Sequence, residues 1–379
     1  MTDLLRQEIA AAAHTVVVKV GTRVLTHDSG RLNEPRIEQL AEQLRRLQQQ
    51  GRKVVLVSSG AVGAGMSQLN LAKRPTDLAK LQAVAAIGQA HLIEIYDRVF
   101  RRRDGHAAQV LLVAEDLQER SRYLNIRNTL LSLLDYQAVP IINENDTVSV
   151  EELMTTFGDN DRLAALVANL LHAPLLVILS DVAGLYNGNP DEPHTHVIPT
   201  VSQFDEALFE MVRDRRTGHS KGGMGSKLNA ARMVTAAGEN VIIASGRQEN
   251  VLLELFEGKP HGTLFIAQGK TVNSRRRWIG FSASPKGRLH LDDGACQAIV
   301  SQGRSLLAIG VHDVEGEFRK GDVVVLCDPK RREVARGLTN YSREEVQKIR
   351  GLSSEKISQV LGHCPYVEVV HRDNLAVWE

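Results

Sequence analysis

Short apolar runs alternate with longer amphipathic segments through the first two thirds of the chain. The short runs are rich in β-branched residues and predict strands; they lie at residues 15–20, 54–57, 109–113, 139–142 and 175–179. The longer segments repeat their apolar positions at helical spacing and predict helices; they lie at residues 33–51, 78–103, 121–136, 162–171, 204–215 and 228–237. Strands and helices that alternate in this way predict an α/β fold, a mostly parallel sheet sandwiched by helices.

The last third of the chain has a different pattern. Short β-like runs at residues 305–311, 323–327, 333–336 and 366–370 are broken by glycine turns, which predicts a small β-rich domain. Because 379 residues exceed one ordinary core, two domains are expected. A polar stretch with three consecutive arginines, residues 275–277, is typical of a linker. We therefore expect a first domain at residues 1–270, a linker at 271–285, the β-rich domain at 286–370 and a C-terminal tail at 371–379.

The composition indicates where in the cell the protein works, but it does not indicate what the protein binds. The chain has 46 Lys plus Arg and 45 Asp plus Glu, a formal net charge of +1, so charge gives no general argument for a nucleic-acid or membrane surface. Cys296, Cys327 and Cys364 are too far apart for a redox pair and too few for a disulfide framework. No apolar stretch reaches the ~18 residues of a membrane span. His194 and His196 lack a third ligand at a familiar spacing. We expect a soluble, cytoplasmic protein with no membrane partner and no metal-ligating residues.

The densest polar cluster lies at residues 141–161, between a predicted strand and a predicted helix. Parallel sheets bind ligands outside the carboxyl ends of their strands. Asn and Asp also gather in ordinary turns, where their side chains bond nearby backbone. Two separate tetrads, NEND at residues 143–146 and GDND at 158–161, favour a functional interpretation. The candidate site residues of this stretch are Asn143, Asn145, Asp146, Asp159, Asn160 and Asp161.

Three further segments of the sequence are candidates for binding phosphate. Lys19 lies in a run of valines just before Gly21; a buried ammonium needs a negative partner, and a glycine lets backbone approach a ligand. An edge-strand lysine that reaches solvent is the alternative. The turn at residues 58–65 is glycine-rich and feeds a helix, but its GxxGxG spacing fits neither a dinucleotide fingerprint nor a Walker A loop. Residues 217–227, TGHSKGGMGSK, place Lys227 at a predicted helix start, where a bound anion would offset the unfavourable dipole.

Together these elements predict phosphoryl transfer. Two lysines, helix N-termini and glycine-exposed amides stabilise charge on a transferring phosphoryl group. The converging loops hold no histidine or cysteine nucleophile, and a carboxylate acceptor is already ionised near neutral pH. Asp161 is expected to hold both lysines in place. Asp146, Asn143 and Asn160 suit the α-ammonium and α-carboxylate of a free amino acid.

Several long motifs carry a family resemblance. The segments VVVKVGTRVLT, VVLVSSGAVGAG, AEDLQERSRYLNIRNTL, VPIINENDTV, GDNDRLAALVA, ILSDVAGLY and GGMGSKLNAA, in this order, closely resemble the glutamate 5-kinase family of the amino-acid kinase superfamily. The segments GRLHLDDGA, SLLAIGV, ARGLTNYSREEV and KIRG resemble a PUA domain. The resemblance implies an amino-acid kinase fold followed by a PUA domain. It implies that ATP, with Mg²⁺, phosphorylates the γ-carboxylate of L-glutamate to L-glutamate 5-phosphate, the first step of proline biosynthesis, with feedback inhibition by proline.

The resemblance also implies roles for individual residues. It implies that Lys19 and Lys227 contact the ATP phosphates; with Asp161, expected to hold them, these are the predicted catalytic residues. Glutamate is bound by Ser59, Asp146 and Asn160, with Asn143 nearby. The nucleotide-binding residues are Lys19, Gly21, Ser180, Asp181, Lys221, Gly222, Gly223, Met224, Gly225, Ser226 and Lys227. This chain departs from the family at Lys221 and Ser226, where threonines are usual.

Partners follow from the same resemblance, and two rival interpretations remain. The family forms dimers or tetramers, and its labile acyl phosphate is suited to transfer to glutamate-5-semialdehyde dehydrogenase. A first rival is a superfamily kinase for N-acetylglutamate, aspartate or a nucleotide; a carboxylate at Asp146 suits a free ammonium and disfavours an acetylated amine. A second rival is an RNA-binding protein, which predicts a basic surface with aromatic residues. Only 4% of the chain is aromatic, so RNA binding by the PUA domain stays open as an accessory role.

Overall fold

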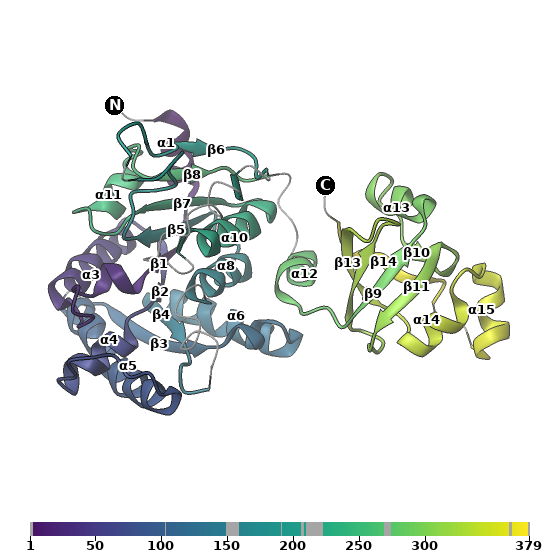
Figure 1. Ribbon diagram of the computed structural model, residues 1–379, viewed down its shortest axis with the longest axis horizontal. Helices are drawn as coiled ribbons and strands as arrows, with labels where there is room; N and C mark the ends of the chain where they lie inside the picture. The colour runs from purple at the N-terminus through teal and green to yellow at the C-terminus, as the bar shows by residue number, and fades with distance from the viewer. Residues whose placement is uncertain are drawn as a thin grey trace. The chain divides into compact units, whose positions relative to one another are not determined.

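The computed structural model describes residues 3–102, 104–148, 159–190, 192–205, 208–209, 223–268, 274–363 and 366–377. The chain divides into two compact units (Figure 1). The N-terminal unit comprises Met1–Asp116 and Ser121–Thr271, and the C-terminal unit comprises Leu117–Arg120 and Val272–Glu379. Among the described residues, no helix combines the length and the apolar character needed to cross a membrane.

The N-terminal unit is built on one eight-stranded sheet with the order β3-β4-β2-β1-β5-β7-β8-β6. Its strands are β1 Thr15–Val20, β2 Lys53–Ser58, β3 His106–Leu112, β4 Ala138–Glu144, β5 Leu175–Ser180, β6 Thr200–Val201, β7 Asn240–Ser245 and β8 Thr263–Phe265. Every neighbouring pair runs parallel except β7 with β8. The predicted mostly parallel sheet is confirmed, and β1 lies inside it, so Lys19 is not an edge-strand lysine.

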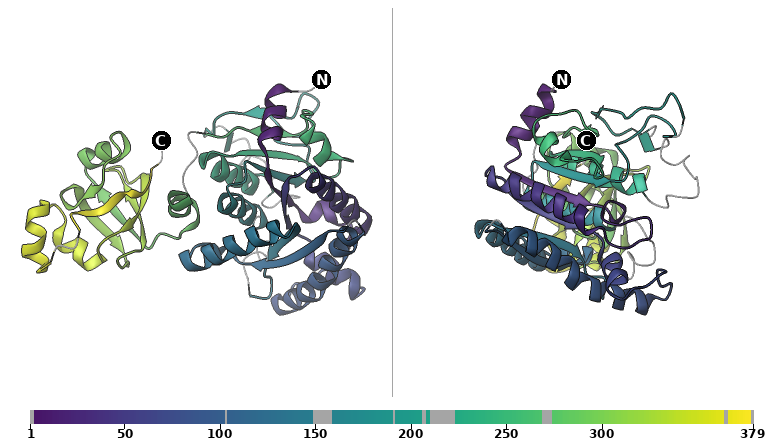
Figure 2. Two further views of the ribbon diagram at one scale, coloured as in Figure 1. Left: turned by 180° about the vertical axis from the view of Figure 1, so that it is seen from behind. Right: turned by 90° about the vertical axis from the view of Figure 1, so that its left-hand side faces the viewer.

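Helices cover both faces of this sheet (Figures 1 and 2). One side carries α3 Glu34–Gln49, α4 Ala61–Gln68, α5 Leu78–Arg101 and α11 Val251–Phe256; the other carries α6 Arg120–Asp135, α8 Asp159–Leu171 and α10 Gly223–Ala236. Short elements complete the unit: α1 Leu4–Ala12, α2 Thr22–Leu25 and η1 Ala114–Leu117.

The register of β1 decides which face receives Lys19. Successive side chains of a strand point to opposite faces. Val16, Val18 and Val20 pack in the core cluster that also contains residues of α3, α5 and α11. Lys19 therefore points to the other face, where α8 packs against β1. A polar residue in a valine run is thus placed opposite the start of α8.

One predicted helix differs from the structure, and another is not tested by it. The helix expected at 228–237 begins earlier, at Gly223, so Lys227 lies within α10 rather than at its start. The flanking glycines favour a loop in the sequence, but Lys227 finds a carboxylate partner that stabilises it inside the helix. The helix expected at 204–215 falls largely outside the described residues.

The C-terminal unit has its own six-stranded sheet, of order β10-β14-β13-β12-β9-β11, and its own apolar core. The strands are β9 Gly287–Leu291, β10 Leu306–Leu307, β11 Val311–Gly316, β12 Val323–Cys327, β13 Glu333–Thr339 and β14 Glu368–Val377. The helices are α12 Ser274–Arg277, η2 Trp278–Ser282, α13 Asp293–Val300, η3 Ala308–Gly310, α14 Arg343–Ile349 and α15 Ser354–Leu361. The predicted β-rich domain is confirmed.

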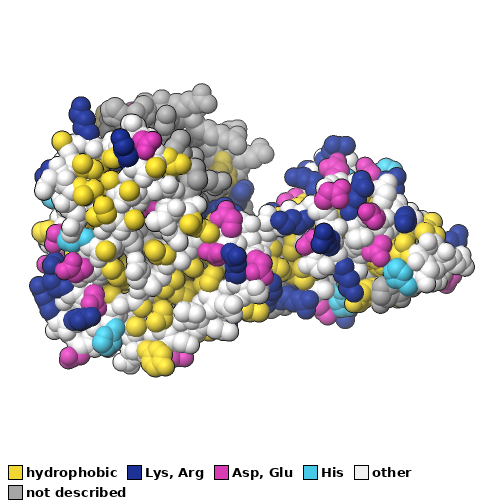
Figure 3. Space-filling view, turned by 90° about the horizontal axis from the view of Figure 1, so that it is seen from below, with side chains coloured by type: hydrophobic (Ala, Val, Ile, Leu, Met, Phe, Trp, Pro, Cys, Tyr) yellow, Lys and Arg dark blue, Asp and Glu magenta, His cyan; other side chains and the backbone are white. Residues whose placement is uncertain are grey.

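Local details of this unit depart from the sequence pattern. The single strand expected at 305–311 is two strands, β10 and β11, separated by the 3₁₀ turn η3. Residues 271–285, expected as a linker, include α12 and η2, and most of the expected tail belongs to β14. On the face seen in Figure 3, basic and acidic side chains of this unit are interspersed.

Candidate functional site

The glycine-rich turn after β2 shapes one wall of the site. Gly60 adopts φ +108°, a left-handed conformation that favours glycine, and α4 begins directly after it. Gly65 and Gly88 have another use: a Cβ on either would lie 1.9 Å from a carbonyl oxygen of the neighbouring helix. These two glycines let α4 and α5 pack backbone to backbone. The turn therefore combines a sharp chain reversal with close helix packing.

A buried cluster of two lysines and one aspartate lies at the carboxyl end of β1. Lys19 Nζ is 2.6 Å from Asp161 Oδ1, and Lys227 Nζ is 3.1 Å from Asp161 Oδ2. The Ser226 hydroxyl donates to the same Oδ2 at 2.8 Å, and Lys227 also donates to the Gly223 carbonyl at 2.8 Å. All three charged residues are buried: Lys19 is 6% exposed, Asp161 is 2% exposed and Lys227 is 8% exposed. Two cations on one anion leave a buried net charge of +1, which attracts an anionic ligand.

The electrostatics of this cluster keep Asp161 ionised. Burial raises the pKa of Asp161, but the ammonium groups of Lys19 and Lys227 and the Ser226 hydroxyl outweigh it and lower the pKa to about 2. Burial lowers the pKa of Lys227, and Asp161 opposes that shift. The carboxylate thus fixes two flexible lysine side chains in one place.

Beside this cluster, buried amides form a chain of hydrogen bonds. The Asn160 amide donates to Ser59 Oγ and to Asn143 Oδ1, each at 3.3 Å. The Asn143 amide donates to Gln89 Oε1 at 2.8 Å. Ser59 follows β2, Asn143 lies near the end of β4 and Asn160 lies in the first turn of α8, so three separate segments of the chain converge here. The sequence did not indicate Gln89, because it lies in an ordinary helical pattern.

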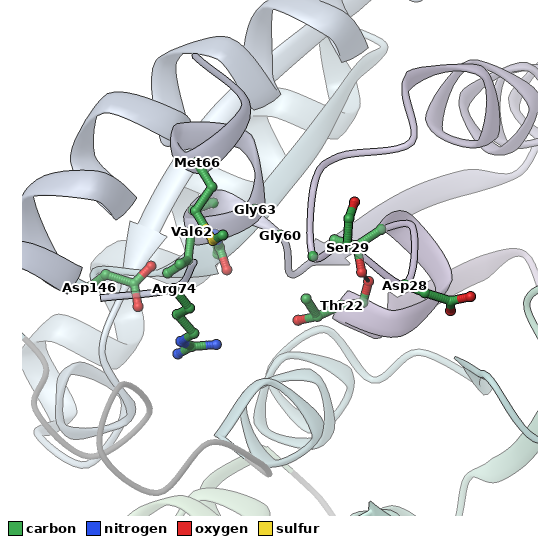
Figure 4. Close-up of a pocket in the computed structure, with 13 residues that line it drawn as sticks. Thr22, Asp28, Ser29, Gly60, Val62, Gly63, Met66, Arg74 and Asp146 are labelled. Atoms are coloured by element: carbon green, nitrogen blue, oxygen red, sulfur yellow. Dashed lines mark hydrogen bonds between the residues drawn. The ribbon is translucent and has the colours of Figure 1, made fainter. Parts of the chain in front are cut away.

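A cavity of about 250 Å³ opens next to these amides (Figure 4). Asp146 and Arg74 lie on one side of it, and Thr22, Ser29 and Asp28 lie on the other. Burial raises the pKa of Asp146 to about 6, and the Arg74 guanidinium partly opposes this. The lining residues are Thr22, Thr26, Asp28, Ser29, Gly30, Gly60, Ala61, Val62, Gly63, Met66, Arg74, Asn143 and Asp146. A carboxylate and a guanidinium side by side match the two charged groups of an α-amino acid.

Arg74 was not among the residues predicted from the sequence. It lies in the polar stretch between α4 and α5, where charged residues are common and no motif marks it. It becomes a candidate only because the structure places it in the lining of the cavity.

Ser180 ends β5, and Asp181 follows it at the same edge of the sheet. The Ser180 hydroxyl donates to Asp181 Oδ1 at 3.1 Å, and Arg23 Nη1 lies 3.1 Å from Asp181 Oδ2. Burial raises the pKa of Asp181, but the hydrogen bond from Arg23 and further hydrogen bonds leave it below the ordinary value. The Gly21 amide donates to the Leu179 carbonyl at 3.1 Å, which ties the chain after β1 to the end of β5.

The remaining predicted residues divide into three groups. Gly223, Met224, Gly225 and Ser226 form the first turn of α10, next to Lys227. Asn145 serves its own turn, since its Oδ1 accepts from the Thr147 hydroxyl at 2.6 Å. Lys221, Gly222, Gly158 and the side chain of Asp159 lie outside the described residues. In the part of the chain that the structure describes, no three His, Cys, Asp or Glu residues gather closely enough to hold a metal ion.

Comparison with known proteins follows the two units. Residues 14–245 match the Amino acid kinase family, and residues 287–361 match the PUA domain. A "Glutamate 5-kinase" of Rhodopirellula baltica is 50% identical over 373 residues, covering 98% of this chain and 96% of that protein. A relative of the same name from Thermoanaerobacter sp. (strain X514) is 46% identical, covering 96% of this chain and 98% of that protein. Another from Methylococcus capsulatus is 45% identical, covering 96% of each chain.

Proposed function

Because this chain belongs to the amino acid kinase family and ends in a PUA domain, we propose that this kinase phosphorylates the γ-carboxylate of L-glutamate with ATP. The observation that carries the proposal is the buried Lys19–Asp161–Lys227 cluster beside a cavity that holds Asp146 and Arg74 on one side. The cluster suits a phosphoryl group, and the cavity suits a free amino acid. The name of the close relatives supports glutamate as that amino acid.

The reaction joins two anions, and the cluster offsets their repulsion. An oxygen of the γ-carboxylate attacks the γ-phosphorus, the bond from that phosphorus to the β,γ-bridging oxygen breaks, and ADP leaves with the electron pair. No proton is transferred, because the acceptor is already ionised. Lys19 and Lys227 stabilise the charge on the transferring group. Asp161 is a positioning residue that holds both ammonium groups before the substrates bind.

The amino-acid end of the substrate is matched by residues of the cavity. We assign the α-ammonium to Asp146 and the α-carboxylate to Arg74, with Asn143, Asn160 and Ser59 as further hydrogen-bond partners. An acetylated amine would leave the Asp146 carboxylate unpaired, which selects against N-acetylglutamate. A shorter substrate anchored by these groups would not bring its side-chain carboxylate as far toward Lys19, which selects against aspartate.

The nucleotide is proposed to bind through Lys19, Gly21, Ser180 and Asp181 and the segment 221–227. Mg²⁺ in kinases is held largely by substrate phosphates with one or two carboxylates. Both oxygens of Asp161 are engaged by lysines, so this carboxylate does not fit the role of a metal ligand. We propose that the ion arrives with the ATP phosphates, whose charge it would partly neutralise.

The wider context is proposed from the family resemblance. The reaction would be the first step of proline biosynthesis, inhibited by proline, in a cytoplasmic homodimer or homotetramer. Transfer of the acyl phosphate to glutamate-5-semialdehyde dehydrogenase fits its lability, and RNA binding by the PUA domain stays open. The kinase domain is proposed to span residues 1–270 and the PUA domain residues 286–370. The stretches 271–285 and 371–379, expected as linker and tail, contribute α12, η2 and part of β14.

The test is ADP release from ATP and Mg²⁺ with free glutamate, N-acetylglutamate, aspartate or UMP as acceptor, with and without proline. Turnover on glutamate alone, with the product trapped as a hydroxamate, is expected. Loss of that turnover with proline would support feedback control. Turnover on another acceptor would overturn the substrate while leaving the lysine roles, and no turnover on any of the four would refute the proposal.

A further inference from the structure

A second cavity of about 300 Å³ lies beside the proposed amino-acid cavity and is strongly basic. Its lining residues are Arg23, Val24, Thr26, His27, Asp28, Asn33, Arg36 and Arg247. Three arginines face a single aspartate, so the wall carries a net charge of +2 with His27 neutral. Thr26 and Asp28 line both cavities. In Figure 4 the Asp28 side chain points away from Asp146 and Arg74. Arg23, Arg36 and Arg247 line the second cavity and not the first.

The basic wall is built from distant parts of the chain that are tied together. Arg36 of α3 donates from Nη2 to the Gly246 carbonyl, and to the Gln248 carbonyl at 2.8 Å. These two residues flank Arg247, so Arg36 anchors the loop that presents it. Burial lowers the pKa of Arg36, and Glu249 opposes this shift. Arg36 therefore holds the loop that carries Arg247 against α3, and both arginines line the same cavity.

The Arg247 guanidinium is available for a ligand. Within the described ranges it has no hydrogen-bond or ion-pair partner, and its side chain is exposed. Arg23 is shared, because its Nη1 lies 3.1 Å from Asp181 Oδ2 at the proposed nucleotide site. An anion bound between Arg247 and Arg23 would compete with Asp181 for the same guanidinium. The second cavity is thus electrostatically connected to the nucleotide site without being part of it.

We propose that this arginine cavity, lined by Arg23, Arg36 and Arg247, binds a small phosphate monoester and thereby weakens nucleotide binding. Guanidinium groups bind phosphate through paired hydrogen bonds, and a monoester carries about two negative charges at neutral pH, which match the net charge of the wall. The Asp28 carboxylate can accept a hydrogen bond from a hydroxyl on the organic part. The ligand class is therefore a hydroxylated phosphate monoester.

The test uses the full-length protein saturated with AMP-PNP and titrated with glycerol 3-phosphate by calorimetry. We expect one binding event that persists with the analogue present and that glycerol alone does not produce. Arg247→Gln should weaken it at least tenfold. Arg102→Gln, which removes the same charge from an exposed position on the same unit, should leave it unchanged. Far-UV circular dichroism and kinase turnover without phosphate monoester verify that both variants fold.

Three results would overturn the site: no binding to the wild type, equal binding by the two variants, or binding abolished by AMP-PNP. The last would place the probe in the nucleotide site. For the coupling, glycerol 3-phosphate should raise the KM for ATP several-fold in the wild type and not in Arg247→Gln. An unchanged KM in the wild type would refute the connection through Arg23. Because the calorimetric binding is measured without turnover, the test of the site is independent of whether glutamate is the substrate.

Discussion

Replacing Asp161 by Asn should destabilise the N-terminal unit by about 3 kcal/mol. The pKa of Asp161 falls from 3.8 to about 2, which corresponds to about 2 kcal/mol in favour of the ionised carboxylate. Asn also leaves Lys19 and Lys227 facing each other in a buried space, and breaking a buried ion pair typically costs about 3–5 kcal/mol. One lysine can lose its proton instead, which limits the cost. We therefore expect the lower end of that range.

Hydrogen exchange of the β1 amides, followed by mass spectrometry or NMR at pH 7, measures this change in the unit concerned. A loss of about 3 kcal/mol corresponds to about 100-fold faster exchange. Trp278 and Trp378 both belong to the C-terminal unit. Unfolding followed by tryptophan fluorescence should therefore stay unchanged, which provides an internal control.

A second variant isolates the charge effect. Lys227→Met keeps the Lys19–Asp161 pair, and the double variant Asp161→Asn with Lys227→Met removes the repulsion between the two lysines. The double variant should recover about 1 kcal/mol or more relative to Asp161→Asn. Exchange within threefold of the wild type in Asp161→Asn, or a double variant no more stable than that single one, would refute the reasoning.

The pH dependence of the same measurement follows from the lowered pKa. A carboxylate with a depressed pKa in the folded state contributes stability above its unfolded pKa, near 4, and loses it as the pH falls toward the folded value. The difference in stability between the wild type and Asp161→Asn, measured by exchange of the β1 amides, should therefore be full at neutral pH. It should disappear as the pH falls from about 4 to about 2.

Four further predictions concern the site and its supporting helices. The pKa of Asp146 is raised to about 6, so kcat/KM for glutamate should fall about tenfold for each pH unit below 6. Asp146→Asn should raise the KM for glutamate and remove this pH dependence. Arg74→Gln should raise the KM for glutamate at least tenfold and leave the KM for ATP unchanged; equal effects on both would contradict its assignment to the α-carboxylate. Lys227→Ala should lower kcat by 10³-fold or more while circular dichroism stays native, and wild-type turnover would remove Lys227 from the site. Gly88→Ala places a Cβ 1.9 Å from the Ala61 carbonyl and should cost about 3 kcal/mol, measured by the exchange of α4 amides, whereas a neutral effect would show that α4 and α5 can separate freely.

Much of the site could be predicted, because its residues carry local signals. A lysine inside a valine run and two Asn and Asp tetrads after a strand are visible in a short window of sequence. The structure brings Lys19, Lys227 and Asp161 into one cluster and joins Ser59, Asn143 and Asn160 through hydrogen bonds. Their assigned chemical roles stay predictions that the variants above test.

Other parts had no local signal. Gln89 and Arg74 look like ordinary helix and loop residues, and the glycines at 65 and 88 look like ligand-binding or helix-weakening positions until α4 and α5 are seen in contact. The arginine cavity joins α2, α3 and the loop after β7, which are more than 200 residues apart at their extremes.

The sequence by itself determined most of the strands and long helices and that the chain has two units, because apolar periodicity and β-branched composition act over a few neighbouring residues. Only the tertiary structure decided that β1 lies between β2 and β5, that Lys19 faces α8, and that Arg74, Asp146 and the three cavity arginines meet across loops. The physical reason is that strand order and register are set by the burial of whole faces. A one-residue shift would turn Lys19 to the opposite face, away from Asp161, so the location of its charge is a property of the packed sheet.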